Sequence, residues 1–405
     1  MMAAATKDFP LVYLNSNDGS SIIGFGGNKS VVATKTSNLD EIQHFLDEHK
    51  NTYIFCYIGY DVKNQIEKLS SQNYDGCKMP NFFFFSPQYV AKIDAKESVF
   101  LQGEDNTEAR QFITDFLKKE NLSSSKQQSI QLKPRTTKEN YLRTVKQLKQ
   151  HIQQGDIYEI TYCQEFYQDN VRLTDPIETY FNTNAVTKGP FSAYLSFDDN
   201  YILCGSPERF LQKDGETLIS QPIKGTAKRG ETLSSDQRIK TELLNDPKER
   251  AENVMIVDLV RNDLSKIAKK NSVKVEELFG IYSFETVHQM ISTIKTEQKD
   301  ESTFTDLLRA LFPMGSMTGA PKYSAMKLIE VYEDFKRGVF SGSIGYIKPN
   351  GDFDLNVVIR SILYNAKEEY ISCPVGGAIT INSDPEKEYE ECITKIGAIL
   401  KALNK

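Results

Sequence analysis

Short apolar runs separated by polar turns dominate the first hundred residues of the chain. They predict strands at residues 11–14, 20–25, 53–57, 82–85 and 99–102. Apolar positions at helical spacing predict helices at 38–50 and 107–119, the first with Asn38 as its N-terminal cap. Residues 121–128 include three consecutive serines and are the best candidate for a linker.

Beyond residue 130 the pattern mixes long helices with strands. Residues 138–154 predict an amphipathic helix that ends at Gly155, and 234–270 predict a helix in at least two parts because Pro247 interrupts it. A closing helix at 387–403 would face inward with Tyr389, Ile393, Ile396, Leu400 and Leu403. Strands are expected at 157–166, 191–197, 201–204, 339–347, 355–364, 369–372 and 378–382. Strands and helices without regular alternation predict the α+β class.

Composition narrows the class of protein. The 405 residues suffice for one large domain or two, and the polar segment suggests a division into 1–127 and 128–405. A net charge of −6 offers no basic field to attract nucleic acid. Six scattered cysteines without a Cys-x-x-Cys pair argue against a disulfide framework or zinc knuckle and suit a reducing compartment. We find no signal-peptide pattern and no membrane-spanning apolar stretch, so we expect a cytoplasmic protein.

Two pairs of glutamates stand near predicted helix starts. Glu249 and Glu252 are three residues apart, as are Glu388 and Glu391, so each pair shares one helix face. Lys395 lies one turn beyond Glu391. For either pair alone, a solvated acidic face is the simpler interpretation. If the pairs converge, four carboxylates need compensation, and Mg²⁺ suits carboxylate and substrate oxygens.

The segment QPIKGTAKRG at 221–230 holds a lysine where a predicted strand gives way to a turn. Pro222 cannot donate to a sheet ladder, and Gly225 lets the backbone bend. In a partly apolar setting, Lys224 can lose its proton and act as a nucleophile. The alternative is a solvated lysine in a turn.

Two glycine-rich turns and two cationic side chains are further candidates. The run GSMTGAPK at 315–322 precedes a predicted helix, and GGA at 376–378 starts a strand, so both expose backbone N–H groups to anions. Arg360 lies in the apolar run 356–363, and if buried it needs a partner. That partner is a substrate carboxylate or an internal salt bridge. His288 is either a core histidine or an acid/base group.

Five stretches, in this order, resemble the signatures of the chorismate-utilising enzymes: 222–226 (PIKGT), 255–264 (MIVDLVRNDL), 319–322 (GAPK), 342–346 (GSIGY) and 359–361 (IRS). That family includes component I of anthranilate synthase and of aminodeoxychorismate synthase, and the isochorismate and salicylate synthases. The match is dense over 130–405 and extends over the first part in outline. It implies an α+β sandwich of β-sheets flanked by helices, with 128–405 as the chorismate-binding catalytic region.

The resemblance implies a metal site built from the four glutamates. Glu252 and Glu391 would hold Mg²⁺, which binds the ring carboxylate of chorismate. Glu249 and Glu388 would stand beside them as supporting or water-mediated ligands. Lys395 would lie near the same substrate carboxylate.

The resemblance also implies the remaining pocket residues. Arg360, with the backbone of Gly376, Gly377 and Ala378, would bind the enolpyruvyl carboxylate. Glu208 would be the general acid for loss of the 4-hydroxyl, with a pKa raised by burial and by neighbouring carboxylates. His288, as a catalytic group, and Ser316 match further pocket positions.

Within the family, the position of Lys224 separates activities. Anthranilate synthases have alanine there, whereas aminodeoxychorismate synthases have lysine. That lysine is proposed to attack C2 of chorismate, after which ammonia attacks C4 and displaces the lysine from C2. The resemblance therefore implies synthesis of 4-amino-4-deoxychorismate, the precursor of 4-aminobenzoate for folate. The alternatives are anthranilate synthase component I and a non-catalytic chorismate-binding scaffold subunit.

Three further features refine this expectation. The isochorismate and salicylate synthases have lysine where Glu159 stands, which argues against those activities. The sequence has no Cys-His-Glu glutaminase domain, so ammonia would come from free ammonium or from a separate glutamine amidotransferase subunit. The Leu-Leu-Glu-Ser motif associated with tryptophan feedback is not found near the N-terminus, so we expect no such inhibition.

Overall fold

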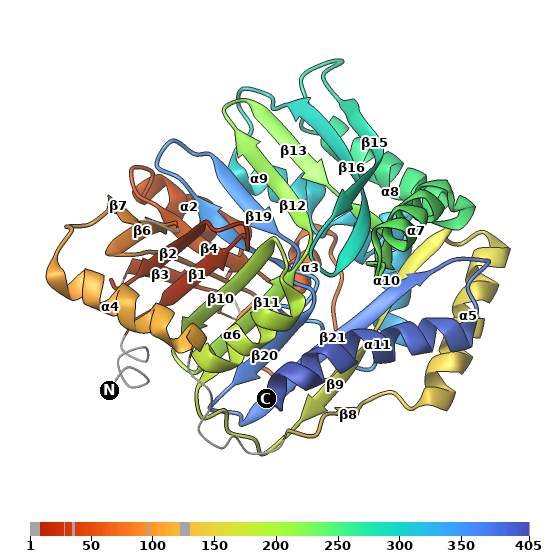
Figure 1. Ribbon diagram of the computed structural model, residues 1–405. Coiled ribbons are helices and arrows are strands. Elements are labelled where there is room, and N and C mark those ends of the chain that lie inside the picture. Colours follow the sequence, from red (N-terminus) through yellow and green to blue (C-terminus); the bar gives the residue numbers. More distant parts are fainter. Residues whose placement is uncertain (1–8, 28, 35–36, 95–96, 122–129, 405) are drawn as a thin grey trace.

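Two large antiparallel β-sheets face each other, and helices cover their outer surfaces (Figure 1). The computed structural model describes residues 9–27, 29–34, 37–94, 97–121 and 130–404. Within these residues, the first sheet has 11 strands and the second has 10. Strands from before and after residue 130 contribute to both sheets.

The 11-stranded sheet places the start of β9 near one edge. Its order is β17 (Gly319–Ala320), β9 (Glu159–Gln168), β21 (Tyr370–Ile379), β20 (Ser361–Asn365), β11 (Asn200–Ser206), β10 (Phe191–Phe197), β1 (Leu11–Asn15), β2 (Ser21–Phe25), β6 (Tyr89–Ile93) and β7 (Ser98–Gln102), with β8 (Lys133–Pro134) paired to β9.

The 10-stranded sheet has β14 at its corresponding end. Its order is β14 (Ile223–Lys228), β16 (Val287–Glu297), β13 (Thr217–Gln221), β12 (Arg209–Asp214), β19 (Phe353–Asn356), β18 (Ser343–Ile347), β4 (Ile54–Ile58), β5 (Phe82–Ser86) and β3 (Lys29–Val32), with β15 (Lys274–Ser283) paired to β16.

Helices pack on both sheets. The α-helices are α2 (Leu39–Glu48), α3 (Lys63–Ile66), α4 (Thr107–Lys118), α5 (Lys138–Gln154), α6 (Pro176–Thr187), α7 (Leu233–Asn245), α8 (Pro247–Ser265), α9 (Phe304–Leu311), α10 (Lys322–Tyr332) and α11 (Pro385–Leu403). Short 3₁₀ turns are η1 (Tyr60–Val62), η2 (Lys119–Asn121) and η3 (Gly315–Met317). Helices α6 and α11 contact the 11-stranded sheet, whereas α7 and α8 contact β14 and β16. None of the helices in the described ranges is both long and apolar enough to cross a membrane.

The core between the sheets is aromatic. All five residues of β5 are buried, as a strand covered on both faces requires. The ring of Phe83 on β5 stacks on that of Phe197 on β10 with centroids 4.2 Å apart, so this pair joins the two sheets. A second core lies between the 11-stranded sheet and its helices and includes Tyr141 of α5 and Ile396 of α11.

Most of the predicted elements are confirmed. Asn38 caps α2, Gly155 ends α5 in a left-handed conformation, and Pro247 starts α8 where the long helix was expected to divide. The sandwich of sheets flanked by helices confirms the α+β class. Strands β3, β6, β8, β12, β15, β16 and β17 were not predicted. The predicted linker and the boundary after residue 127 lie outside the described residues.

The single strand predicted at 355–364 is wrong. Its beginning belongs to β19 in the 10-stranded sheet and its end to β20 in the 11-stranded sheet. The chain crosses between the sheets at 357–360, and Arg360 has a φ of 54°, so it is not a strand arginine. Apolar periodicity does not detect this break because the crossing residues Val357 and Val358 are themselves buried.

Two smaller predictions are also corrected. The separate strands expected at 369–372 and 378–382 form one strand, β21. Ile393 was expected to face inward, but it is 41% exposed, whereas Ile396 and Leu403 of the same helix are buried.

We expect Phe83→Ala to lower the free energy of unfolding by about 3–5 kcal/mol, because it removes a buried ring and leaves a cavity between the sheets. Urea denaturation measures this loss. Val331→Ala on α10, whose side chain is 72% exposed, is the control and should change stability by less than about 0.5 kcal/mol. Equal effects of the two substitutions would contradict a core centred on β5 and β10.

Candidate active site

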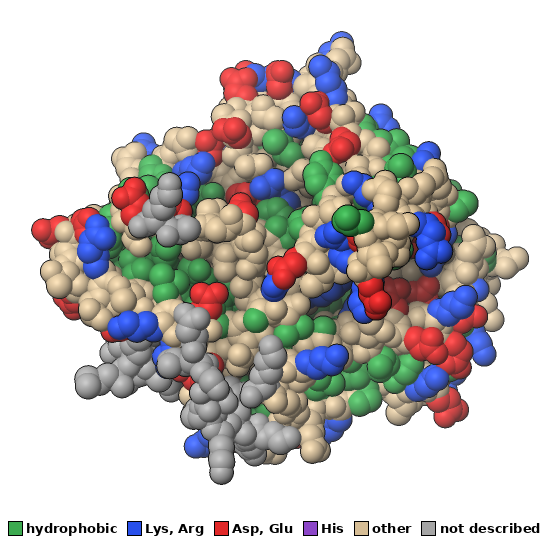
Figure 2. Space-filling view, in the orientation of Figure 1, with side chains coloured by type: hydrophobic (Ala, Val, Ile, Leu, Met, Phe, Trp, Pro, Cys, Tyr) green, Lys and Arg blue, Asp and Glu red, His purple; other side chains and the backbone are tan. Residues whose placement is uncertain are grey.

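The four predicted glutamates converge where the N-terminal turns of α8 and α11 meet. Asp246 and Asp384 cap these helices, and a proline occupies the first turn of each. Lys248 Nζ lies 3.8 Å from Glu252 Oε1 on its own helix and 3.7 Å from Glu388 Oε1 on the other. Figure 2 shows acidic side chains recessed in a hollow between the α7–α8 region and α11.

Burial makes negative charge costly in this cluster. It raises the pKa of Glu252 to about 7, and it also raises the pKa values of Glu249 and Glu388. Burial opposes the charge of Glu391 too, but Lys395 Nζ, 2.7 Å from Glu391 Oε1, holds the pKa of that carboxyl below its usual value. The cluster therefore favours a bound cation.

The residues present fit Mg²⁺. Glu252 Oε1 is buried without a hydrogen-bond partner in the described part of the chain, and the Lys248 ammonium stands near two of the carboxylates. Hard carboxylate oxygens are the donors that Mg²⁺ prefers. Across the described ranges, no three His, Cys, Asp or Glu side chains are placed so that they could hold a metal ion by themselves. Such a site would therefore take further oxygen ligands from substrate or water.

Lys224 reaches the cluster from β14 of the 10-stranded sheet, on which α8 packs. It lies within β14 rather than at a turn, and the pairing of β14 with β16 is irregular between Ile223 and Thr226. Gly225 has a φ of 95°, and a Cβ there would lie 3.2 Å from Glu249 Oε2. The irregular strand thus brings the lysine backbone close to α8.

Lys224 is paired with a carboxylate, so its surroundings favour the charged amine, whereas the sequence suggested an apolar setting in which it can lose its proton. Its side chain is 11% exposed, and its Nζ donates to Glu159 Oε1 at 2.7 Å. Burial alone would lower the pKa of Lys224, but Glu159, Glu252 and Glu208 together raise it above its usual value. Sequence reasoning noted only the apolar neighbours of the lysine and could not place these carboxylates around it.

Glu208 has the environment of a general acid. It lies between β11 and β12 and is 5% exposed, and burial raises its pKa to about 7. Ser316 Oγ is near enough to lower that pKa slightly, although within the described structure it makes no hydrogen bond of standard geometry. At neutral pH a large share of Glu208 therefore keeps its proton.

Arg360 and the last residues of β21 lie beside the glutamates. Gly376, Gly377 and Ala378 pair with β9 near the end of β21, so they do not start a strand as the sequence suggested. The guanidinium of Arg360 makes no ion pair or hydrogen bond within the described residues, so the internal salt bridge considered from the sequence is not formed. Burial lowers its pKa, while Glu391 raises it. Lys395 Nζ donates to Gly376 O at 2.6 Å, and a Cβ on Gly377 would lie 3.4 Å from Glu388 Oε2. Gly376, Gly377 and Ala378 thus lie beside the glutamates.

The hydrogen bonds of His288 within the described residues go to groups other than the predicted site residues. It is buried in β16, where Nε2 lies 3.0 Å from Asp236 Oδ1 and Nδ1 lies 2.8 Å from Ser283 Oγ. Arg229 also pairs with Asp236, so the imidazole joins a network that fastens the start of α7 to the sheet. No hydrogen bond within the described ranges joins His288 to Lys224 or to the glutamates. These contacts are those expected of a core histidine, which is one of the two interpretations considered from the sequence.

Lys248 is a member of the cluster that sequence reasoning missed. Its position four residues before Glu252 was the available signal, because that spacing places both on one helix face. Nothing in the sequence indicated that Glu388 would lie at a similar distance from it.

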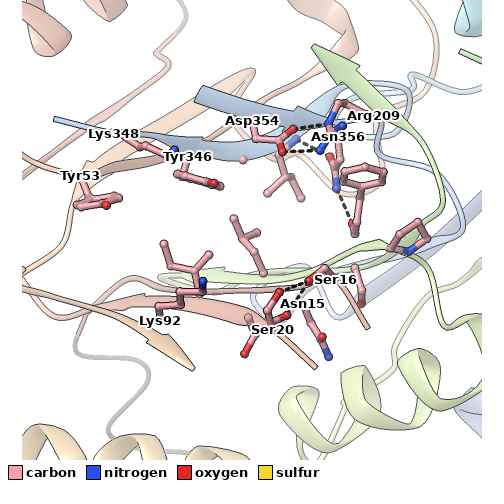
Figure 3. Close-up of a pocket in the computed structure, with 18 of the residues that line it drawn as sticks. Asn15, Ser16, Ser20, Tyr53, Lys92, Arg209, Tyr346, Lys348, Asp354 and Asn356 are labelled. Carbon is pink, nitrogen blue, oxygen red and sulfur yellow. Dashed lines mark hydrogen bonds and ion pairs between the residues drawn. The ribbon is translucent and has the colours of Figure 1, made fainter. Parts of the chain in front are cut away.

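A separate cavity of about 490 Å³ lies between the sheets (Figure 3). Lys92 and Ser20 line it on one side, and Tyr53 and Lys348 on the other. Arg209, which follows Glu208, lies in the wall of this cavity. Its Nε and Nη2 each donate to the carboxylate of Asp354 at 2.9 Å. None of the predicted catalytic or metal-binding residues is among those that line it.

The sequence and the fold match known proteins. A family model described as "chorismate binding enzyme" matches residues 9–401. The chain is 36% identical over 376 residues to a chloroplastic aminodeoxychorismate synthase of Arabidopsis thaliana, covering 87% of this chain and 40% of the relative. It is 32% identical over 360 residues to aminodeoxychorismate synthase component 1 of Bacillus subtilis, covering 86% and 76%.

Proteins named anthranilate synthase are also similar to this chain. Anthranilate synthase component 1 of Aquifex aeolicus is 32% identical over 365 residues, covering 86% of this chain and 73% of that protein. The crystal structure of anthranilate synthase component I from Streptococcus pneumoniae superposes with a TM-score of 0.78 at 25% identity, covering 94% and 92%. From the family model and these relatives together, we conclude that the chain belongs to the family of chorismate binding enzymes.

Proposed function

We propose that this chain is the chorismate-aminating component of an aminodeoxychorismate synthase, which converts chorismate and ammonia to 4-amino-4-deoxychorismate for 4-aminobenzoate and folate. The observation that carries the proposal is the buried amine of Lys224, enclosed by Glu159, Glu208 and Glu252. Two similar relatives bear the name aminodeoxychorismate synthase, which supports the same assignment.

In the proposed reaction, Arg360 and Lys395 bind the two carboxylates of chorismate. Both are cationic, and Arg360 makes no ion pair within the described residues. The glutamates of α8 and α11 would hold Mg²⁺, which neutralises them and binds a substrate carboxylate when present.

Glu208 supplies the proton for the leaving group. Its pKa of about 7 allows it to give a proton to the 4-hydroxyl, which departs as water while the free amine of Lys224 bonds to C2. Ammonia then bonds to C4 and the lysine leaves, so one difficult displacement is divided into two. The ammonium group newly formed at C4 returns a proton to Glu208. The net reaction therefore consumes chorismate and ammonia and forms aminodeoxychorismate and water.

The ammonia would come from a separate glutamine amidotransferase subunit. One of the similar relatives is named component 1, which supports a division of labour between two chains. In vitro, an ammonium salt should supply the ammonia in place of that subunit.

Anthranilate synthase component I is the second candidate. The Aquifex relative and the Streptococcus structure bear this name at similar identity. This reaction would also begin with chorismate and ammonia, but it would release pyruvate and end in anthranilate. Lys224 favours the first candidate because an amine at this position offers a covalent route that alanine does not.

We expect incubation with chorismate, Mg²⁺ and ammonium to yield aminodeoxychorismate as the main product. Mass spectrometry of the mixture decides between the candidates, and a reaction without ammonium is the control. Anthranilate and pyruvate as main products would sink the proposal in favour of the second candidate.

The metal assignment is tested by Glu252→Gln and Glu391→Gln. Each removes one carboxylate charge with little change of shape, so Mg²⁺ affinity in the presence of chorismate should fall at least about tenfold. Titration calorimetry measures this without turnover. Glu386→Gln is the control, since Glu386 lies on the same helix but pairs with Lys138 at the surface. If both test variants bind Mg²⁺ as tightly as the control, the glutamates do not hold the metal.

The nucleophile is tested by Lys224→Arg, which keeps a charge opposite Glu159 and removes the primary amine. Truncation to alanine would leave the buried Glu159 unpaired, which typically costs about 3–5 kcal/mol. Without ammonia, wild-type protein incubated with chorismate should gain a substrate-derived mass, whereas Lys224→Arg should gain none.

The exposed Lys228 of the same strand supplies the matched control. Lys228→Arg should form the adduct like the wild type, and peptide mapping should place it on Lys224. An adduct that persists in Lys224→Arg, or that maps to another lysine, would show that Lys224 has a structural role.

A further inference from the structure

The contact between Glu159 and Lys224 is the most enclosed ion pair of the site. Glu159 begins β9 in the 11-stranded sheet, and Lys224 belongs to β14 in the 10-stranded sheet, so the contact bridges the two sheets. Oxygen Oε1 of Glu159 accepts from Lys224 Nζ at 2.7 Å, and Glu159 is 1% exposed. Water therefore has little access to the proton that the pair shares.

A nucleophilic Lys224 has a proton to lose. Carboxylates from several elements face it: Glu159 from β9, Glu208 before β12, Glu249 and Glu252 from α8, and Glu391 from α11. Their combined field holds the amine in its charged form. An ammonium has no lone pair with which to attack carbon, so the proposed reaction requires a proton acceptor within reach.

Glu159 is the carboxylate placed to accept that proton. It forms the hydrogen bond with Lys224 Nζ, and its other oxygen, Oε2, is buried without a partner in the described structure. Glu208 has to carry a proton for the leaving group, and Glu252 is assigned to the metal. The remaining glutamates make no hydrogen bond to the amine in the described ranges.

We infer that Glu159 is the general base that takes the proton from Lys224 and so releases the amine to attack chorismate. This inference rests on the proposed function, because it requires Lys224 to be the nucleophile. Bound substrate removes water from around the pair, and in a drier site an ion pair loses its advantage over a neutral acid and amine. The transfer therefore coincides with substrate binding.

The protons balance over a full cycle. Glu159 gains the proton of Lys224, and the neutral amine bonds to C2 while Glu208 protonates the departing 4-hydroxyl. When ammonia bonds to C4, Lys224 leaves as a neutral amine and recovers its proton from Glu159. The proton lost by Glu208 is replaced from the product ammonium.

Glu159→Gln tests the inference because it keeps the shape and removes the proton acceptor. In single-turnover experiments without ammonia, at saturating chorismate, the rate of adduct formation measured by mass should fall about 100-fold or more. Chorismate affinity should change little, because Glu159 is not assigned to the substrate. Glu178→Gln on α6 is the control, since Glu178 is also buried with one unpartnered oxygen within the described residues.

The pH dependence separates a base from a merely structural carboxylate. Well below pH 7, where most of Glu208 keeps its proton, the wild-type adduct rate should vary little with pH because the transfer is internal. In Glu159→Gln, only the Lys224 that has lost its proton to solvent reacts. Its rate should therefore rise about tenfold per pH unit.

The outcomes are distinguishable. If wild-type protein forms no adduct on Lys224, the proposed nucleophile is wrong and the inference fails with it. If Glu159→Gln forms the adduct at the wild-type rate and with wild-type pH dependence, the inference alone is overturned. Should Glu159→Gln fail to fold, Glu159→Asp decides, because a shorter carboxylate should give a slower rate that still varies little with pH. A steep pH dependence in Glu159→Asp would overturn the inference.

Discussion

Buried negative charge is the constraint on which this site depends. Glu159, Glu208, Glu252 and Glu388 each have less than a tenth of their surface exposed. A carboxylate in such a place is expensive unless a cation or a proton compensates it. The protein uses each means in a different place: an ammonium beside Glu159, a raised pKa at Glu208, and a cluster suited to a divalent cation at α8 and α11.

The two-sheet sandwich makes this concentration of charge possible. Lys224 comes from one sheet and Glu159 from the other, while α8 and α11 direct their capped N-termini toward the same place. A buried pair of Arg337 and Glu333 strengthens the arrangement near β9. Arg337 donates to Met317 O at 2.7 Å and to Thr161 O at 2.8 Å, so it ties the loop that carries Ser316 to the strand that carries Glu159.

The elements that were predicted correctly are those whose information is local. Asn38, Gly155 and Pro247 act through their own backbone neighbours, and the apolar period of α5 is readable within one segment. The prediction of one strand at 355–364 was wrong because both strands and the crossing between them are apolar. Only the placement of β19 and β20 in different sheets divides the run. The prediction that Ile393 faces inward was wrong because the neighbouring elements, and not the helix period alone, decide which flank of α11 is covered.

For the site, the sequence by itself determined which groups are present: the spaced glutamates, the lysine in 222–226, the glycine pair in 376–378 and the family to which they belong. Only the tertiary structure decided their chemical states. The charged form of Lys224 is favoured because Glu159, 65 residues away in the chain, lies 2.7 Å from it, and the pKa of Glu208 is raised to about 7 because the fold buries it. Spacing along a chain fixes residue types and helix faces, but charge depends on distances in space and on the exclusion of water, which the folded chain alone supplies.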